Sequence, residues 1–524
     1  MTAGPEQHSL RPSWRREWSR RAASVTNVAL AFLIAGCAAK AAPATPVGAL
    51  AGSQSSVDQL RRDLRSIFST ADIDHAFWGI AVRSLKTGEL LFSLNANRMQ
   101  TPASNMKLIT TAIAVERLGW DYRYWTKIYA TGPLLSGGEL DGDLVIVSNG
   151  DPTINPRHPD RWGALDAFAK QLYAQGVRRI GGQLIGDDNA FAEPGWGFGW
   201  AWDDLTTGYG AAVGALQYNE NQVELLIGPG LEAGERAIIS LSPPGSGVIL
   251  DHAVTTAAVG QPSRVSVERI PGSNMLRVSG QMAVGASAIT ELAAVPNPTL
   301  LYLNALREAL ARNGIFVGGG PLDIDDARVK PDYAKSTLLL EDQSPAIASV
   351  IDVCNKWSRN EYAETLLRSL AGVPAEATAE AGLVVVNETL AKWGIGRELY
   401  VARDGSGLSR NNYVAPVALL GLLAHVWNDA RLMEPYRATL PQSAVSGTLE
   451  NRMKGTAAAE RVWAKTGSMS QVRTISGYLL TLDNEPVVFS MMANGFHVPA
   501  SRIDAIMDEA LVRLVKFPRE LHEE

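Results

Sequence analysis

Hydrophobic and polar positions divide the chain into segments of helical and of strand-like period. Over residues 57–71 apolar side chains recur every three or four positions, the spacing of a helix with one buried face. Residues 77–94 instead alternate on both sides of a polar turn at 86–89, which predicts a β-hairpin. The alanine-rich segment 101–118 returns to helical spacing and ends at Gly119, a typical helix stop.

The middle of the chain has a different character from its two ends. From about residue 125 to 294, short apolar runs separated by turn residues predict strands, and helical spacing resumes only at 300–313. Two strands and a helix are then expected at 474–482, 486–493 and 501–515. Since strands are predicted near both ends of the chain, we expect one sheet to join them.

The first residues have the pattern of an export signal rather than of a folded segment. A basic, arginine-rich stretch precedes the short apolar run Val25–Ala35, and Ile34-Ala35-Gly36-Cys37 resembles a bacterial lipobox. We therefore interpret residues 1–37 as a signal peptide with lipidation at Cys37, and the Ala-, Pro- and Ser-rich residues 38–56 as a flexible tether. A plain secretory signal is the alternative, and Sec and twin-arginine export both remain open.

Composition narrows the class of protein. The chain has 524 residues, 46% hydrophobic and 19% charged, which predicts a globular protein of two or three domains. Its net charge of -6 gives no general basic surface, which argues against a nucleic acid partner. If Cys37 carries lipid, the other cysteine, Cys354, has no disulfide partner, and its helical spacing with apolar neighbours predicts a buried, unreactive side chain.

Candidate chemistry begins at the start of the helix predicted over 101–118. Ser104 and Lys107 are three residues apart, which places a hydroxyl and an amine on one face of the first helical turn. The backbone N–H groups of such a turn are unpaired and can stabilise an anion. The pattern indicates a nucleophile beside a base, although a lone Ser-x-x-Lys is weak evidence.

Two further motifs follow in the order that such a site requires. They are Ser358-Arg359-Asn360, placed before a predicted helix, and Lys465-Thr466-Gly467-Ser468, placed before a predicted strand. A second Lys-Thr-Gly at Lys86 lies in the hairpin turn and is interpreted as structural. Ser-x-Asn also occurs at Ser93, before the nucleophile, and at Ser409, in a glycine-rich loop; Ser409 and Arg410 are kept as possible supporting residues at the rim of the site.

Together with Gly150-Asp151-Pro152-Thr153 and the loop 404–410, these motifs resemble the D-alanyl-D-alanine carboxypeptidase/endopeptidase family, peptidase family S13 of the penicillin-binding protein 4 type. The resemblance runs from about residue 57 to the C-terminus. It implies an α/β (α+β) fold: a penicillin-binding, β-lactamase-like catalytic domain with an antiparallel sheet and helices, over residues 57–124 and 295–524. Residues 125–294 are expected to form one or two inserted, β-rich domains.

The resemblance also implies a role for each motif residue. Ser104 is the nucleophile and Lys107 its base, with Ser358 between the two lysines as a proton relay; Asn360, Lys465, Thr466 and Gly467 bind substrate, and the backbone N–H groups of Ser104 and Ser468 form the oxyanion hole. A free lysine has a pKa near 10.4, so burial and a second ammonium at Lys465 must lower that of Lys107 by about 3. Arg359 departs from the Asp or Asn common at its position, which affects substrate preference rather than chemistry.

This pattern predicts a serine D,D-peptidase of the bacterial cell envelope, on the periplasmic side, held to a membrane only by its N-terminal lipid. Its expected partners are peptidoglycan muropeptides and β-lactam antibiotics. The seven histidines lack ligand spacing, so neither a metal nor a cofactor is expected. A β-lactamase or esterase on the same frame and a non-catalytic penicillin-binding scaffold are the alternatives. No Glu-x-x-Leu-Asn segment for deacylation is present, and the intact motifs argue against a scaffold.

One aromatic segment is outside these motifs. Trp196-Gly197-Phe198-Gly199-Trp200-Ala201-Trp202 can serve as a carbohydrate-stacking platform or as a packed aromatic loop, and packing is favoured.

Overall fold

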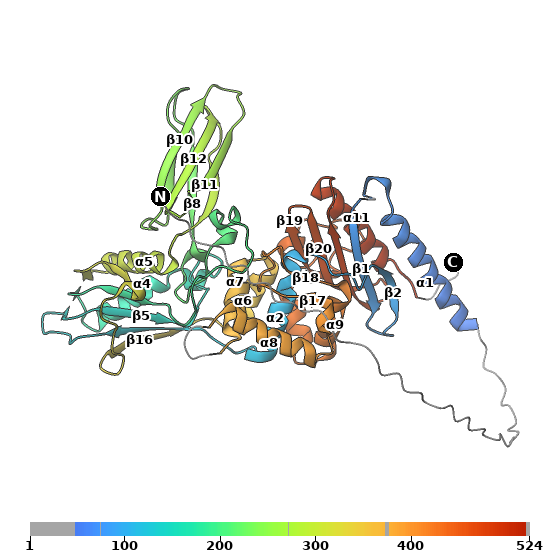
Figure 1. Ribbon diagram of the computed structural model, residues 1–524, viewed down its shortest axis with the longest axis horizontal. Helices are drawn as coiled ribbons and strands as arrows, with labels where there is room; N and C mark the ends of the chain where they lie inside the picture. Colours follow the sequence, from blue (N-terminus) through green and yellow to red (C-terminus); the bar gives the residue numbers. More distant parts are fainter. Residues whose placement is uncertain (1–47, 74, 271, 373–376, 520–524) are drawn as a thin grey trace, which may run out of the picture. The chain divides into compact units, whose positions relative to one another are not determined.

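A five-stranded antiparallel sheet, drawn from both ends of the chain, forms the base of the catalytic region in the computed structural model (Figure 1). The model describes residues 48–73, 75–270, 272–372 and 377–519. The strands run in the order β19 (Val462–Met469), β20 (Val472–Leu480), β21 (Pro486–Asn494), β1 (Phe77–Ser84) and β2 (Leu90–Leu94). Strand β1 pairs with β21 along its whole length, which confirms that the sheet joins the two ends of the chain.

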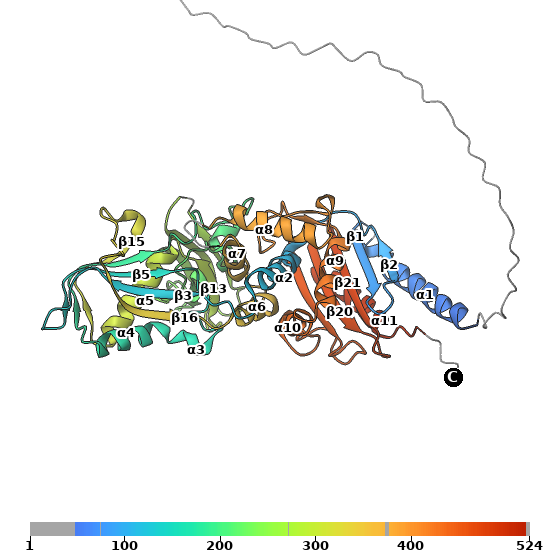
Figure 2. The same cartoon turned by 90° about the horizontal axis from the view of Figure 1, so that it is seen from below.

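Helices cover both faces of this sheet, because its central strands are apolar on both sides (Figure 2). One face packs against α1 (Gly48–Ile67) and α11 (Ala500–Val515), through side chains such as Leu64 and Leu511. The other face packs against α2 (Met106–Leu118) and α9 (Pro416–Asn428). The same core continues into four more helices: α6 (Ile347–Lys356), α7 (Asn360–Ser369), α8 (Ala379–Lys392) and α10 (Met433–Thr439). No helix in the described ranges is both long and apolar enough to span a bilayer.

A second five-stranded sheet lies within the inserted part of the chain. Its order is β15 (Pro321–Asp323), β7 (Leu184–Asp187), β5 (Leu144–Ser148), β3 (Trp125–Ala130) and β16 (Thr337–Gln343). The helices α4 (Ala164–Ala174) and α5 (Pro298–Arg312) pack on it through one apolar core. Its neighbours are the short helix α3 (Pro159–Trp162) and a small sheet of β14 (Phe316–Val317), β6 (Arg179–Ile180) and β4 (Glu139–Leu140).

The inserted part therefore extends beyond the expected limit at residue 294. Helix α5 was expected to return the chain to the catalytic domain, but its apolar face packs against α4. Strand β16 then pairs antiparallel with β3, so that Gln343 lies opposite Trp125. The chain thus enters the inserted sheet at Trp125 and leaves it at Gln343, on the neighbouring strand.

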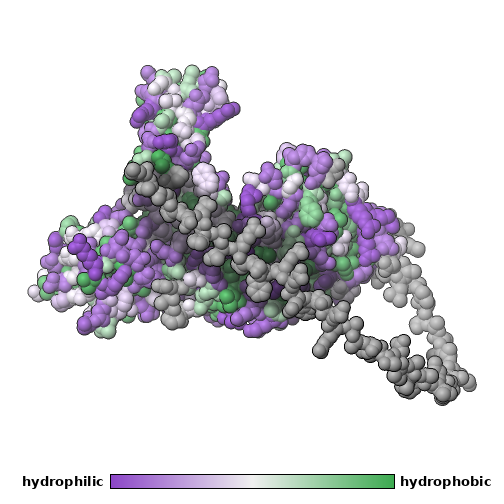
Figure 3. Space-filling view, in the orientation of Figure 1, coloured by the Kyte–Doolittle hydropathy of each residue, from purple (hydrophilic) through white to green (hydrophobic). Residues whose placement is uncertain are grey.

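A third region consists of two three-stranded sheets that share one core (Figure 1). Their orders are β13 (Ile289–Ala294), β8 (Gln222–Gly228), β9 (Ile238–Ser242), and β10 (Ile249–Ala257), β12 (Met275–Ala283), β11 (Arg264–Arg269). The described residues also contain the two-stranded pair β17 (Tyr400–Val401) and β18 (Tyr413–Val414). The β10–β12–β11 sheet shows mostly hydrophilic side chains on the face seen in Figure 3.

Candidate active site

The nucleophile candidate lies in a tight turn that leads into α2. Ser104 is the middle residue of the 3-10 helix η2 (Ala103–Asn105), and α2 follows directly at Met106. Ala103 has a positive φ of 45°, a conformation that costs free energy for a residue with a Cβ. The expected helix thus begins as a strained turn that exposes the Ser104 hydroxyl to a pocket.

Two glycines allow the chain to approach this turn closely. A Cβ on Gly467 of β19 would lie 3.0 Å from the Ser104 backbone nitrogen and 2.2 Å from Thr474 Oγ1. A Cβ on Gly407, where φ is 84°, would lie 1.8 Å from the Ala103 carbonyl oxygen. Because neither position has room for a side chain, the third motif and the 404–410 loop can both press against the nucleophile.

Lys107 is fully buried directly beneath Ser104. Its Nζ donates to Ser104 Oγ at 3.0 Å, to Asn360 Oδ1 at 2.6 Å and to the Ser406 carbonyl oxygen at 2.7 Å. Burial lowers the pKa of Lys107 to about 8, although Cys354, Asp404 and Glu364 oppose this by favouring the charged form. A neutral amine that can accept the Ser104 proton is therefore accessible near neutral pH.

The two polar residues of the second motif each contact a different lysine. Ser358, which has a positive φ of 58°, accepts a hydrogen bond from Lys465 Nζ at 2.8 Å. Among the contacts of the described residues, Lys107 is bonded to Asn360 and not to Ser358. Asn360 is engaged on its other side as well, since its Nδ2 donates to the Tyr209 carbonyl oxygen at 2.8 Å. The two lysines thus have separate partners in this state.

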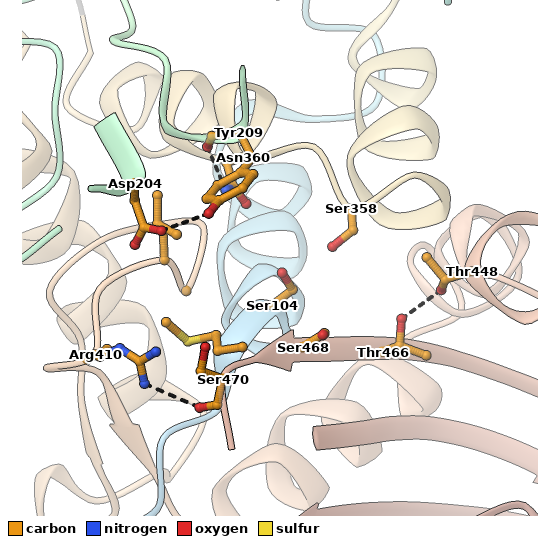
Figure 4. Close-up of a pocket in the computed structure, with 13 residues that line it drawn as sticks. Ser104, Asp204, Tyr209, Ser358, Asn360, Arg410, Thr448, Thr466, Ser468 and Ser470 are labelled. Carbon is orange, nitrogen blue, oxygen red and sulfur yellow. Dashed lines mark hydrogen bonds between the residues drawn. The ribbon is translucent and has the colours of Figure 1, made fainter. Parts of the chain in front are cut away.

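The third motif lies on β19, the edge strand of the catalytic sheet. Lys465 is buried, and burial together with the charge of Lys107 holds the pKa of Lys465 well below its usual value. Thr466 Oγ1 bonds to Thr448 Oγ1 at 2.7 Å, and Ser468 faces the pocket beside it (Figure 4). An edge strand leaves alternate N–H groups unpaired by its neighbour, so β19 can present backbone donors to a ligand.

These groups meet in a pocket of about 310 Å³ (Figure 4). Its lining brings together Ser104, Ser358, Asn360, Thr466 and Ser468 with three residues of the 404–410 loop, Gly407, Leu408 and Arg410. It also contains residues that the sequence analysis did not single out: Asp204, Tyr209, Thr448, Met469 and Ser470. Asp204 and Tyr209 belong to the inserted part of the chain, which therefore supplies one wall of the site. Their sequence offers no motif at fixed spacing, so only the fold could reveal them.

A carboxylate network behind the pocket fixes the loop that holds Lys107. Asp404 accepts from the backbone N–H groups of Gly407 at 2.8 Å and Ser409 at 2.6 Å. Glu364 accepts from the N–H groups of Gly405 and Ser406, at 2.9 and 2.8 Å. This orients the Ser406 carbonyl toward Lys107. Of the two residues kept as supporting candidates, Arg410 lines the pocket, whereas Ser409 is buried within the loop.

Other residues singled out by the sequence lie away from the chemistry or outside the described residues. Cys354 is buried in the core beside α2, as its spacing predicted, and burial raises its thiol pKa to about 11, which disfavours the reactive thiolate. Lys86 lies in the turn between β1 and β2. Cys37 lies outside the described residues.

One group of carboxylates in the inserted part has the spacing of possible metal ligands. Asp188, Glu193 and Asp323 place one oxygen each within 4.8 Å of one another. Asp188 accepts from Thr299 Oγ1 and Asp323 accepts from Asn297 Nδ2, both at the start of α5. These bonds give the two aspartates a structural role in fixing that helix.

The fold and the site define a penicillin-binding type of serine hydrolase: a buried lysine donates a hydrogen bond to a serine in the turn that begins a helix, next to an edge strand that carries a second lysine. A sequence model of the D-Ala-D-Ala carboxypeptidase 3 (S13) family matches residues 60–514. The chain belongs to this family, as the resemblance predicted.

Individual relatives agree with this assignment. The D-alanyl-D-alanine carboxypeptidase of Actinomadura sp. (strain R39) is 33% identical over 531 residues, covering 98% of this chain and 94% of the relative. DacB, a D-alanyl-D-alanine carboxypeptidase of Haemophilus influenzae, is 26% identical over 85% of this chain and 90% of its own. The crystal structure of penicillin-binding protein 4 from H. influenzae has a TM-score of 0.76 at 24% identity, and covers 87% of this chain and 100% of that one. The expected fold class is thereby confirmed.

Proposed function

We propose that this enzyme hydrolyses the D-Ala-D-Ala bond of peptidoglycan stem peptides through an acyl-enzyme on Ser104. The observation that carries the proposal is the 3.0 Å contact between Ser104 Oγ and the buried Lys107 Nζ, whose pKa of about 8 makes a neutral amine available. The same reaction on a cross-linked peptide gives D,D-endopeptidase activity, since both substrates present a D,D bond to the nucleophile.

Each motif residue has a place in the proposed cycle. Neutral Lys107 takes the Ser104 proton as the hydroxyl attacks the carbonyl carbon, and the N–H groups of Ser104 and Ser468 stabilise the resulting oxyanion. The Lys465–Ser358 contact of 2.8 Å supports a proton path to the departing D-alanine amine. Thr466 binds the terminal carboxylate, whose negative charge favours the ammonium form of Lys465 beside it. Water then releases the acyl group from Ser104.

Asn360 has contacts that support a positioning role beside the expected substrate contact. Its Oδ1 accepts from Lys107 and its Nδ2 donates to the Tyr209 carbonyl, so its amide is already occupied on both sides. We infer that it positions Lys107 and ties the inserted part to the catalytic helices, while its second N–H remains for the substrate backbone.

The proposed setting is the bacterial cell envelope. Export and lipidation at Cys37 would place the enzyme on the periplasmic side of a membrane, with peptidoglycan as substrate and β-lactams as acylating inhibitors. Radiolabelled palmitate incorporation that disappears in Cys37→Ser tests the anchor separately from the chemistry.

The direct test is D-alanine release from diacetyl-Lys-D-Ala-D-Ala, with and without benzylpenicillin. We expect turnover of the peptide and its progressive loss as penicillin acylates the enzyme. Rapid consumption of penicillin with little peptide turnover would instead favour the β-lactamase, and neither reaction would favour a scaffold. Diacetyl-Lys-D-Ala-D-Lac, whose scissile bond is an ester with a better leaving group, reports acylation of Ser104 when departure of the amine is not limiting.

The pKa of Lys107 predicts the pH dependence of the reaction. Because the base must be neutral, and its pKa is lowered to about 8, only about one tenth of the free enzyme is active at pH 7. We expect kcat/KM to rise about tenfold per pH unit below 8 and to level above it, in a profile measured with the diacetyl peptide. A flat profile between pH 6 and 9 would contradict Lys107 as the base.

A further inference from the structure

The aromatic segment 196–202 is only partly explained by packing. Trp200 Nε1 donates to Asp404 Oδ2 at 3.0 Å, which anchors the segment to the loop that supports Lys107. Phe198 lies 5.5 Å from the Arg403 guanidinium, ring centre to Cζ. Trp196 and Trp202 are 42% and 74% exposed, however, although indole rings are rarely left in water without a reason. The anchored segment therefore holds two indoles at the surface.

Both exposed indoles line a second pocket of about 310 Å³. Its other lining residues come from the 3-10 helix η3 (Asp204–Thr206), from the end of β11 and the turn after it, and from the residues after β13: Leu205, Thr206, Arg269, Gly272, Ser273, Asn274, Val295 and Pro296. Apolar rings, short polar side chains and one cation thus share a single concave surface.

Arg269 is the unusual group in this pocket. Its Nη2 donates to the Ala294 carbonyl oxygen, while its Nη1 is buried without a hydrogen-bond partner among the described residues. It also forms no ion pair with a carboxylate in those residues, and burial lowers its pKa. A half-buried guanidinium with an unpaired donor is costly. Arg269 also lines the pocket, where its charge favours an anionic ligand such as a carboxylate.

The second pocket is adjacent to the active site along the chain. Asp204 and Tyr209 line the catalytic pocket, whereas Leu205 and Thr206, between them, line the second. The same segment is tied to the catalytic helices by the Asn360–Tyr209 hydrogen bond of 2.8 Å. The segment 204–209 therefore contributes to the walls of both pockets.

We propose that the second pocket binds the glycan portion of the peptidoglycan substrate, with pyranose rings stacked on Trp196 and Trp202 and a carboxylate near the sugar paired with Arg269. This rests on the proposed function, which supplies a substrate that is a peptide attached to an amino-sugar chain. The apolar faces of pyranose rings suit exposed indoles, and the pocket contains Ser273, Asn274 and Thr206 as hydrogen-bonding groups for acetamido and hydroxyl substituents.

The test measures binding rather than turnover, with the full-length Ser104→Ala chain and calorimetry. The probes are N-acetylglucosaminyl-N-acetylmuramic acid, which has rings and a carboxylate, and chitobiose, which has rings alone. We expect the acid to bind about tenfold more tightly than chitobiose. Trp202→Ala should weaken both by about fivefold or more, and Arg269→Gln should remove the advantage of the acid. Phe198→Ala, in the same segment but outside the pocket, should change neither.

A third probe, the same disaccharide amidated with a dipeptide that ends in a carboxylate, identifies the source of the anion. Arg269-dependent binding of this probe places the carboxylate on the stem peptide and supports the site. Loss of that dependence would overturn the pairing with Arg269, because the carboxyl group of the sugar is consumed in the amide bond to the stem peptide. No binding of any probe to the Ser104→Ala chain, or binding unchanged by Trp202→Ala, would overturn it. Failure of the proposed function is a separate outcome. It would appear as absent D-alanine release by the unmutated chain, whether or not the sugar probes bind.

Discussion

Ser104→Ala is expected to abolish D-alanine release and covalent labelling by penicillin together. The alanine removes the only atom that can form the acyl bond, while Lys107 and the surrounding contacts stay in place. Losses on the order of 10⁴-fold or more in kcat are typical when a catalytic serine is removed. Intact mass spectrometry after incubation with benzylpenicillin checks the adduct, and an amino-acid oxidase assay checks release of D-alanine.

Ser470→Ala is the matched control, because Ser470 lines the same pocket and only its backbone oxygen accepts a bond, from Arg410. It should retain both the adduct and the activity within a few-fold. A penicillin adduct that persists in Ser104→Ala, mapped by peptide mass to Ser358 or another hydroxyl, would contradict the assignment of the nucleophile.

Lys107→Met should lower acylation by penicillin and by the peptide by about 10³- to 10⁴-fold, the usual contribution of a general base together with its positioning. Methionine fills a similar volume in the buried site but cannot accept a proton. The change leaves the Ser406 carbonyl and Asn360 Oδ1 without their donor, which costs about 1–3 kcal/mol each. Removing a buried amine that favours its charged form in solution offsets part of this cost.

Acylation rates from stopped-flow displacement of a fluorescent penicillin measure the effect, and thermal unfolding monitored by circular dichroism shows that the variant is folded. Lys86→Met, in the other Lys-Thr-Gly of the chain, is the control and should behave like the unmutated enzyme. If Lys107→Met acylates within tenfold of the unmutated rate, the proton must go elsewhere, and Lys465 would be the base.

The sequence predicted which groups meet in the pocket, because each motif has a fixed local spacing. Ser104 and Lys107 lie one turn apart, and the contact between Lys465 and Ser358 joins two motifs that the chain order already paired. The sheet shared by the chain ends was also predictable, since alternation of apolar residues fixes which segments are strands. These features depend on short-range periodicity and spacing, and the structure confirms the sheet and brings the motif residues into one pocket.

Other features depend on long-range packing and left no such pattern. Asp204 and Tyr209 reach the pocket through long-range contacts, such as the one between Asn360 and the Tyr209 carbonyl, which joins residues 151 positions apart. The limit of the inserted part was misplaced because α5 has the same helical period whichever sheet it packs on. Ser358 was expected to contact both lysines. In the structure it contacts Lys465, while the Lys107 amine donates to Asn360 instead.

The pairing of Trp125 with Gln343 has a consequence for how such a chain can fold. Bringing the ends of a long flexible segment together costs conformational entropy that grows with its length. When that segment folds by itself and pairs its own first and last strands, the contacts within the insert offset this entropic cost. The two parts of the catalytic region are then joined by what is in effect a short connection. The length of the insert then has little effect on how fast the two parts of the catalytic region come together. Inserted domains of very different size can therefore be accommodated between the first and second motifs.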